Sequence, residues 1–150
     1  MIGRFEVFTL ALSEMTSSWN KIATEELKPY GLKGSCIIYL IALYKMPDGL
    51  TAANLCEMCN RDKAEVSRAI KSLELKGFVA RKNTTVSGYR ANITLTEEGR
   101  KITSELRERI KLLVEDGGMG LSEEQREIFY EALAKISCNL KSMASLNNQH

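Results

Sequence analysis

The fold is decided by residues 62–81, which read DKAEVSRAIKSLELKGFVAR. Asp62, with Glu65 three residues later, forms a capping-box-like start for a helix, and Gly77 ends that helix. The helix has one apolar face, made of Val66, Ala69, Ile70 and Leu73. Strand-like residues follow directly after the glycine. We therefore expect an amphipathic helix that leads straight into a strand.

A shorter helix comes just before this one. The hydroxyl of Thr51 can cap its first turn, and it ends at Asn60, a residue type that tolerates the left-handed conformation needed to leave a helix. About three residues separate the two helices, which is the usual length of the turn in a helix-turn-helix. The pair is therefore predicted to form that motif.

Two strand-like segments, 78–82 and 90–95, follow the second helix. The polar loop between them, 83–89, contains Gly88 and is too long for a two-residue hairpin turn. We expect a β-hairpin, or wing, whose loop projects as a finger beside the preceding helix.

Two further helices are expected in the middle of the chain. Residues 34–46 are apolar on nearly every side, which predicts a central buried helix. Thr96 caps a long helix that continues to a glycine-rich turn at 117–120. This turn is not a phosphate-binding loop, because no strand-like run precedes it and no Lys-Ser or Lys-Thr pair follows it.

Each end of the chain is predicted to be a helix with a continuous apolar seam. In the first helix, which ends at Pro29 and Gly31, the seam runs at spacings of three and four through Phe5, Phe8, Leu12, Met15, Trp19 and Ile22. The last helix opens with a capping box of Ser122 and Gln125. Its seam runs through Phe129, Leu133, Ile136, Leu140 and Met143.

One small helix-turn-helix core cannot cover both seams. They can pack onto their own domain, but interleaving with a second copy is the simpler solution and predicts a homodimer. The expected dimer contacts are Phe5, Phe8, Leu12, Met15, Phe129, Leu133, Ile136 and Leu140. The predicted organisation is a dimerisation region (1–30 and 100–146), a winged helix-turn-helix (31–99) and a disordered tail (147–150).

Composition excludes most enzyme chemistry. The chain has 150 residues, a formal net charge of +2 and a single histidine, His150, so a Ser-His or Cys-His catalytic pair would depend on a terminal residue. No nucleophile-elbow, phosphate-loop or dinucleotide motif is present. We expect a non-enzyme that needs no cofactor. No apolar run approaches the ~20 residues of a membrane-spanning helix, so we expect a cytoplasmic protein that does not contact membranes.

The net charge is distributed unevenly. Residues 61–90 hold eight basic and three acidic side chains, a local balance of +5, so the rest of the chain carries −3. A positive segment that coincides with a helix-turn-helix indicates a phosphate-binding surface. The candidate DNA-binding residues are Lys63, Ala64, Ser67, Arg68, Lys71, Arg81, Lys82 and Arg90. Arg68 is the first choice as base reader, with Ser67 beside it; the alternative for each is phosphate contact or solvation.

Residues 62–81, followed by Leu95-Thr96-Glu97-Glu98-Gly99, resemble the MarR family of bacterial transcriptional regulators. The order of elements agrees over nearly the whole chain. The resemblance implies a mainly α fold with a small β-hairpin wing, flanked by N- and C-terminal dimerisation helices. It also implies a homodimer that reads a pseudo-palindromic operator in double-stranded DNA and is released by a small aromatic effector or by thiol oxidation. Plausible lining groups for such an effector are Trp19, Tyr30, Tyr39 and Tyr44.

The chain departs from the family pattern at three places. Ser87, Gly88 and Tyr89 stand where the wing commonly has an acidic residue, one further residue and an arginine, so Arg90 is the candidate for the minor-groove contact. Lys33 stands where a capping threonine is common. The cysteine of the family's peroxide sensors, near the start of the first helix, has no counterpart, so peroxide sensing by that route does not transfer.

The four cysteines are expected to be reduced thiols, because disulfides are rare in cytoplasmic proteins. Cys56 and Cys59 form a Cys-x-x-Cys in the shorter helix. Packing is the first interpretation, a thiol redox switch the second and zinc the third, because the ligand count for a metal is poor.

The leading hypothesis is a homodimeric, sequence-specific DNA-binding regulator, most simply a repressor that occludes a promoter. The rival from another class is a winged-helix module for protein assembly without sequence-specific DNA binding. An exposed apolar patch on the second helix of the helix-turn-helix would favour the rival.

Overall fold

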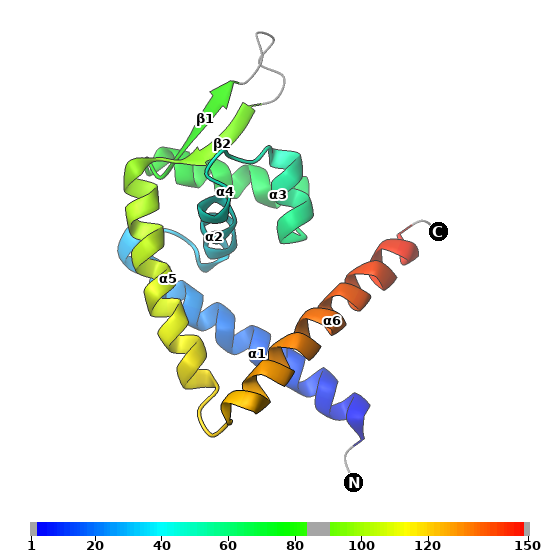
Figure 1. Cartoon of the computed structure of the whole chain (residues 1–150). Coiled ribbons are helices and arrows are strands. Elements are labelled where there is room, and N and C mark those ends of the chain that lie inside the picture. The colour runs from blue at the N-terminus through cyan, green and yellow to red at the C-terminus, as the bar shows by residue number, and fades with distance from the viewer. Residues whose placement is uncertain (1–2, 84–90, 149–150) are drawn as a thin grey trace. The chain divides into compact units, whose positions relative to one another are not determined.

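The computed structural model describes residues 3–83 and 91–148, and it is mainly helical with one two-stranded sheet (Figure 1). The elements are α1 (Arg4–Leu27), η1 (Lys28–Tyr30), η2 (Gly34–Cys36), α2 (Ile37–Lys45), α3 (Ala52–Cys59), α4 (Lys63–Leu75), β1 (Val79–Asn83), β2 (Ala91–Leu95), α5 (Glu97–Gly117) and α6 (Glu123–Asn147). The chain forms two compact units that divide within α5, between residues 108 and 109. The predicted fold class, a winged helix-turn-helix flanked by long helices, is confirmed.

Helix α2 lies at the centre of the first unit, as its apolar sequence predicted. Leu40 and Leu43 are fully buried, and α2 packs against α3, β2 and η2. The surrounding helices each contribute a fully buried or nearly fully buried leucine: Leu27, Leu55, Leu73 and Leu106. Each such side chain stabilises the fold by about 1.5–3 kcal/mol relative to an exposed one.

The central helix starts later than predicted. The segment 34–46 begins with the 3₁₀ turn η2, and the α-helix starts only at Ile37. Lys33 precedes η2, and its side chain does not cap the helix. The first turn is instead closed by a bond from the Cys36 N–H to the Lys33 carbonyl, the 3₁₀ pattern that satisfies a helix end without a side-chain cap.

The helix-turn-helix is built from the predicted caps. Thr51 and Asn54 form a reciprocal capping box at the start of α3. Asn60 ends α3 with a left-handed backbone (φ 50°). Asp62 then accepts a hydrogen bond of 2.8 Å from the Glu65 N–H, which is the N-cap half of the predicted box. These caps hold α3 and α4 at a tight turn.

The wing is an antiparallel pair in which Val79 lies opposite Leu95 and Arg81 opposite Ile93. Strand β1 runs one residue later than predicted at both ends, and residues 84–90, which include the predicted start of the second strand, lie outside the described part of the chain. Thr96 caps α5 through the Gly99 N–H and donates to the Gly77 carbonyl. A Cβ on Gly99 would collide with the carbonyl of Phe78, so only glycine lets α5 begin so close to the wing.

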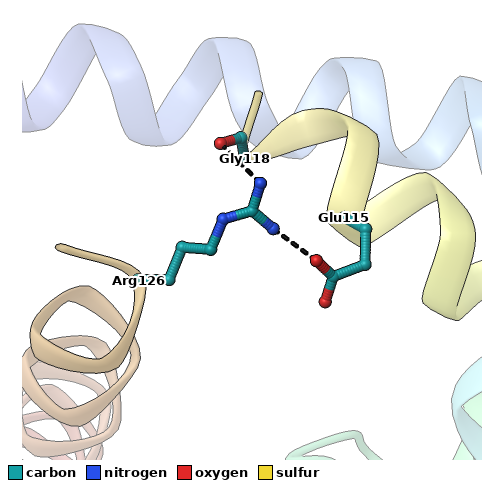
Figure 2. A network of polar contacts seen from close by, with 3 residues as sticks. All are labelled: Glu115, Gly118 and Arg126. Atoms are coloured by element: carbon teal, nitrogen blue, oxygen red, sulfur yellow. Dashed lines mark hydrogen bonds and ion pairs between the residues drawn. The ribbon is translucent and has the colours of Figure 1, made fainter. Parts of the chain in front are cut away.

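The second unit contains the turn between α5 and α6. Ser122 and Gln125 form the predicted capping box, and Gly120 adopts a left-handed conformation (φ 91°). Figure 2 shows that Arg126 reaches back from α6 to the Glu115 carboxylate and, at 3.0 Å, to the Gly118 carbonyl oxygen. The glycine segment is thus the helix-to-helix turn that the sequence predicted.

None of the described helices has the length and apolar character that a membrane-spanning segment requires.

Candidate nucleic-acid interface

Helix α4 presents one polar face on a rigid support. Its apolar face is buried where the sequence predicted, and the helix packs against α3, η2 and β1. All five candidate DNA-binding residues of α4 are exposed: Lys63, Ala64, Ser67, Arg68 and Lys71. The burial of the opposite face fixes which way this exposed face points.

The polar side chains of this face have no hydrogen-bond or ion-pair partner among the described residues. In the part of the chain that the structure describes, Lys63, Ser67, Arg68 and Lys71 make no side-chain hydrogen bond or ion pair. They are therefore available to a ligand. An arginine on such a face can pair bidentately with guanine, and lysines can neutralise phosphates.

The two cations of β1 lie on opposite faces of the wing. Side chains alternate along a strand, so Arg81 shares a face with the buried Val79, whereas Lys82 points to the other side. The Nε of Arg81 donates to Glu74 Oε1 of α4 at 2.8 Å. Lys82 is exposed. Arg90 and the predicted departures at Ser87, Gly88 and Tyr89 lie outside the described residues.

The acidic residues of the positive segment are largely engaged in local structure. Asp62 caps α4 and Glu74 pairs with Arg81, which leaves Glu65 as the third acid among residues 61–83. The positive charge of this segment therefore belongs mainly to exposed side chains. In the sequence, Glu74 is one of the three acidic residues of this segment, and its distance of seven residues from Arg81, across the end of a helix into a strand, is the only signal for the pair.

Both terminal helices expose their apolar seams in the single chain. On α1 the predicted dimer contacts Phe5, Phe8, Leu12 and Met15 are all exposed, and Phe5 reaches 77%. On α6 the same holds for Phe129, Leu133, Ile136 and Leu140, and α6 has no buried residue at all. Apolar patches of this kind mark surfaces that bind another molecule.

The cysteines differ in accessibility. Cys36 and Cys59 are buried, and desolvation raises the pKa of both thiols above their ordinary value of 9.0. Cys56 is half-buried and Cys138 is exposed. Burial of Cys59 agrees with the packing interpretation, and a raised pKa makes a thiol a poor nucleophile. No group of three or more potential metal ligands comes together within residues 3–83 and 91–148.

The aromatic residues proposed as effector-lining groups differ in burial and in contacts. Tyr39 is buried in the core, and Tyr30 packs edge-on against Phe78 at 6.4 Å. Tyr44 is half-exposed, with the guanidinium groups of Arg100 and Arg107 at 4.9 and 4.4 Å from its ring centre. Hydrogen bonds from Ser104 and Arg107, together with both positive charges, lower the pKa of Tyr44.

Comparison with known proteins finds similarity to one family. Residues 30–86 match the family model described as "MarR family". An uncharacterized HTH-type transcriptional regulator of Bacillus subtilis, YybA, is 27% identical over 122 residues, which cover 81% of each chain.

Solved structures match the fold over most of the chain. A MarR transcriptional regulator from Methanosarcina mazei superimposes with a TM-score of 0.85 at 21% identity, covering 95% of this chain and 94% of that one. A putative MarR family regulator from Listeria monocytogenes, solved in complex with a 26mer DNA, gives a TM-score of 0.81 at 21% identity, covering 88% and 87%.

Proposed function

We propose that this chain is a member of the MarR family of transcriptional regulators and that it acts as a homodimeric, sequence-specific DNA-binding repressor. The observation that carries the proposal is the exposed face of α4, on which four polar side chains are uncommitted and the opposite face is locked into the core. That arrangement suits a helix that lies in the major groove.

The roles of the residues follow from their chemistry. Arg68, in the middle of the exposed face, is the base reader, because arginine forms two hydrogen bonds to guanine O6 and N7. Ser67 contacts an adjacent base edge or phosphate. Lys63 and Lys71, nearer the two ends of the helix, neutralise phosphates on either side of the groove.

The wing extends the contact beyond the recognition helix. Arg81 and Lys82 stand on β1, which follows α4 in the chain, and Arg90 comes directly before β2 in the sequence. We place Arg81 and Lys82 on phosphates and Arg90 in the adjacent minor groove. The Listeria monocytogenes relative solved with DNA supports double-stranded DNA as the partner.

A second copy of the chain is the partner that suits the seams of α1 and α6. Eleven large apolar side chains lie exposed along them, and burying this apolar surface against a second copy would stabilise a dimer. A two-fold dimer would place two α4 helices on half-sites about one helical turn apart, which makes the operator pseudo-palindromic. Repression then follows from occlusion of a promoter, in the cytoplasm where the DNA lies.

Relief by a small ligand is favoured over relief by thiol oxidation. Cys36 and Cys59 are buried with raised pKa values, so they react slowly with oxidants. Trp19 on α1 and Tyr44 on α2 keep exposed aromatic surface for an aromatic effector, whereas Tyr39 is committed to the core.

The rival function, a module for protein assembly, calls for an apolar patch on α4. Leu75, 80% exposed at the C-terminal end, is the one large apolar side chain that the described α4 exposes. A single leucine is not a patch, so DNA is the better partner for this face.

A matched pair of variants tests the proposal. Arg68→Ala should lose discrimination between the preferred and unrelated DNA, with about 1–3 kcal/mol of specificity lost, whereas Lys71→Ala should weaken binding to all sequences about equally. Fluorescence anisotropy with both DNAs measures the two effects. Full discrimination in Arg68→Ala would remove its base-reading role, and absence of DNA binding by the unmodified chain at low salt would defeat the proposed function.

A further inference from the structure

We propose that Glu74 is a positioning residue for DNA binding: it orders the guanidinium of Arg81 so that the terminal amino groups of that side chain can bind a DNA phosphate. The inference rests on the proposed function. An acidic residue at a DNA-binding surface would by its charge alone oppose binding. In this role Glu74 favours it.

The geometry of the pair supports this role. Glu74 Oε1 accepts a hydrogen bond of 2.8 Å from Arg81 Nε, so the bond uses the nitrogen nearest the side-chain stem. The two terminal Nη groups donate no hydrogen bond to any described residue. Both side chains remain partly exposed, 44% for Arg81 and 33% for Glu74. An anion can therefore reach the outer edge of the guanidinium while the inner edge is held.

The pair also joins two elements of the interface. Glu74 lies in the last turn of α4, and Arg81 is the third residue of β1, on the strand face that carries the buried Val79. Gly77 turns the chain between them with a positive φ of 77°. The ion pair bridges this turn and ties the base of the wing to the recognition helix.

The ion pair favours binding because it orders the Arg81 side chain before DNA binds. A free arginine loses rotamer freedom when it docks on a phosphate, and that loss opposes binding. An arginine already held by a carboxylate loses less. The Glu74 charge also repels the DNA backbone, so its net effect on affinity depends on which contribution is larger. We infer that ordering is larger, because the pair is direct and partly shielded from water.

The two possible roles of Glu74 predict opposite changes in DNA affinity when its charge is removed. If Glu74 acts only through its charge, Glu74→Gln tightens DNA binding. If Glu74 positions Arg81, Glu74→Gln weakens binding, and the double variant with Arg81→Ala binds no more weakly than Arg81→Ala alone. Loss of one phosphate contact also lowers the slope of log K against log salt by about 0.9.

The experiment measures the affinity of the full chain for its selected DNA at several salt concentrations. We expect Glu74→Gln to weaken binding about five-fold, because one phosphate contact is partly lost. The slope of log K against log salt should also become shallower. Glu65→Gln is the control, an acid on the same helix that makes no ion pair with a described residue, and it should bind as tightly as the unmodified chain or more tightly. Equal or tighter binding by Glu74→Gln overturns the proposal.

A charge swap separates positioning from structural support. Glu74→Lys combined with Arg81→Glu restores an ion pair between α4 and β1, so the melting temperature should recover, but it turns the carboxylate toward the DNA. We expect DNA affinity to remain low in the swapped protein. Recovery of affinity would show that the pair only braces the wing. Failure of the unmodified chain to bind DNA would instead defeat the proposed function, so the two failures are distinguishable.

Discussion

Helices α4 and α6 carry the same kind of apolar pattern but bury it differently. In α4 the periodic face is enclosed by its own chain, and Leu73 is fully buried. In α6 the residues of the seam stay about 40% exposed or more, and the single chain buries none of them. A period of three and four residues predicts that a face will be covered; it does not say which chain covers it.

The two regions should therefore respond differently to dilution. Stability that comes from the core of the first unit is a property of one chain and is independent of protein concentration. In the proposed dimer, stability that comes from the seams depends on a second copy and weakens as the protein is diluted.

The largest effect is expected from charges placed in the α6 seam. Leu133→Asp with Leu140→Asp should abolish the dimer, because two carboxylates would have to enter an apolar interface. Light scattering after size-exclusion chromatography would show the mass of one chain, and DNA affinity should fall with it. The control is Lys135→Asp, about a third of a turn away from the seam. A dimer that survives the double substitution would mean that α6 is covered in another way.

A core substitution should give the second largest effect. Leu73→Ala removes a fully buried side chain from the core side of α4, and we expect the free energy of unfolding to fall by about 2–5 kcal/mol. Urea titrations at two protein concentrations measure it. Because Leu73 is buried by its own chain, the decrease in the free energy of unfolding should be the same at both protein concentrations. A decrease that became larger on dilution would place Leu73 at an interface between chains.

The smallest effect concerns the cysteines. Cys138 lies on the side of α6 opposite the seam, so it should react with a thiol reagent in the folded dimer, whereas Cys36 and Cys59 should react only when the chain opens. Mass spectrometry of partly labelled protein gives the order. Labelling of Cys36 before Cys138 would contradict the burial seen here.

The same thiols set a dependence on pH. The pKa of Cys36 and Cys59 is raised in the folded chain, so their thiols stay protonated there while the unfolded chain ionises them near the ordinary value of 9.0. Stability is thus unaffected by these groups below that pH and falls as pH rises above it. Urea unfolding at pH 8 and at about pH 10 would show the decrease, and replacing both cysteines with alanine should reduce it.

Local sequence patterns predicted most of the fold because their physical causes are local. The caps at Thr51, Asn60 and Ser122 each depend on residues within four positions of one another, and the buried face of α4 follows from apolar residues that recur every three or four positions. The later start of α2 accompanies the missing side-chain cap at Lys33, a departure that is visible in the sequence.

The candidate site was predictable only in part. The outward direction of Lys63, Arg68 and Lys71 follows from helical periodicity alone. The pairing of Glu74 with Arg81 depends on how the chain turns at Gly77, which no single period describes. The sequence therefore predicted which cations are exposed on α4, but not that Arg81 of β1 pairs with Glu74.

Selection of bound sequences from random DNA tests the central claim most directly. If two α4 helices of a homodimer read the major groove, the enriched sequences should contain an inverted repeat whose half-sites lie about 10 base pairs apart, centre to centre. The dimer-defective Leu133→Asp, Leu140→Asp protein should enrich no such repeat. Enrichment of an isolated half-site, or of no sequence at all, by the unmodified chain would contradict a homodimeric, sequence-specific DNA-binding protein.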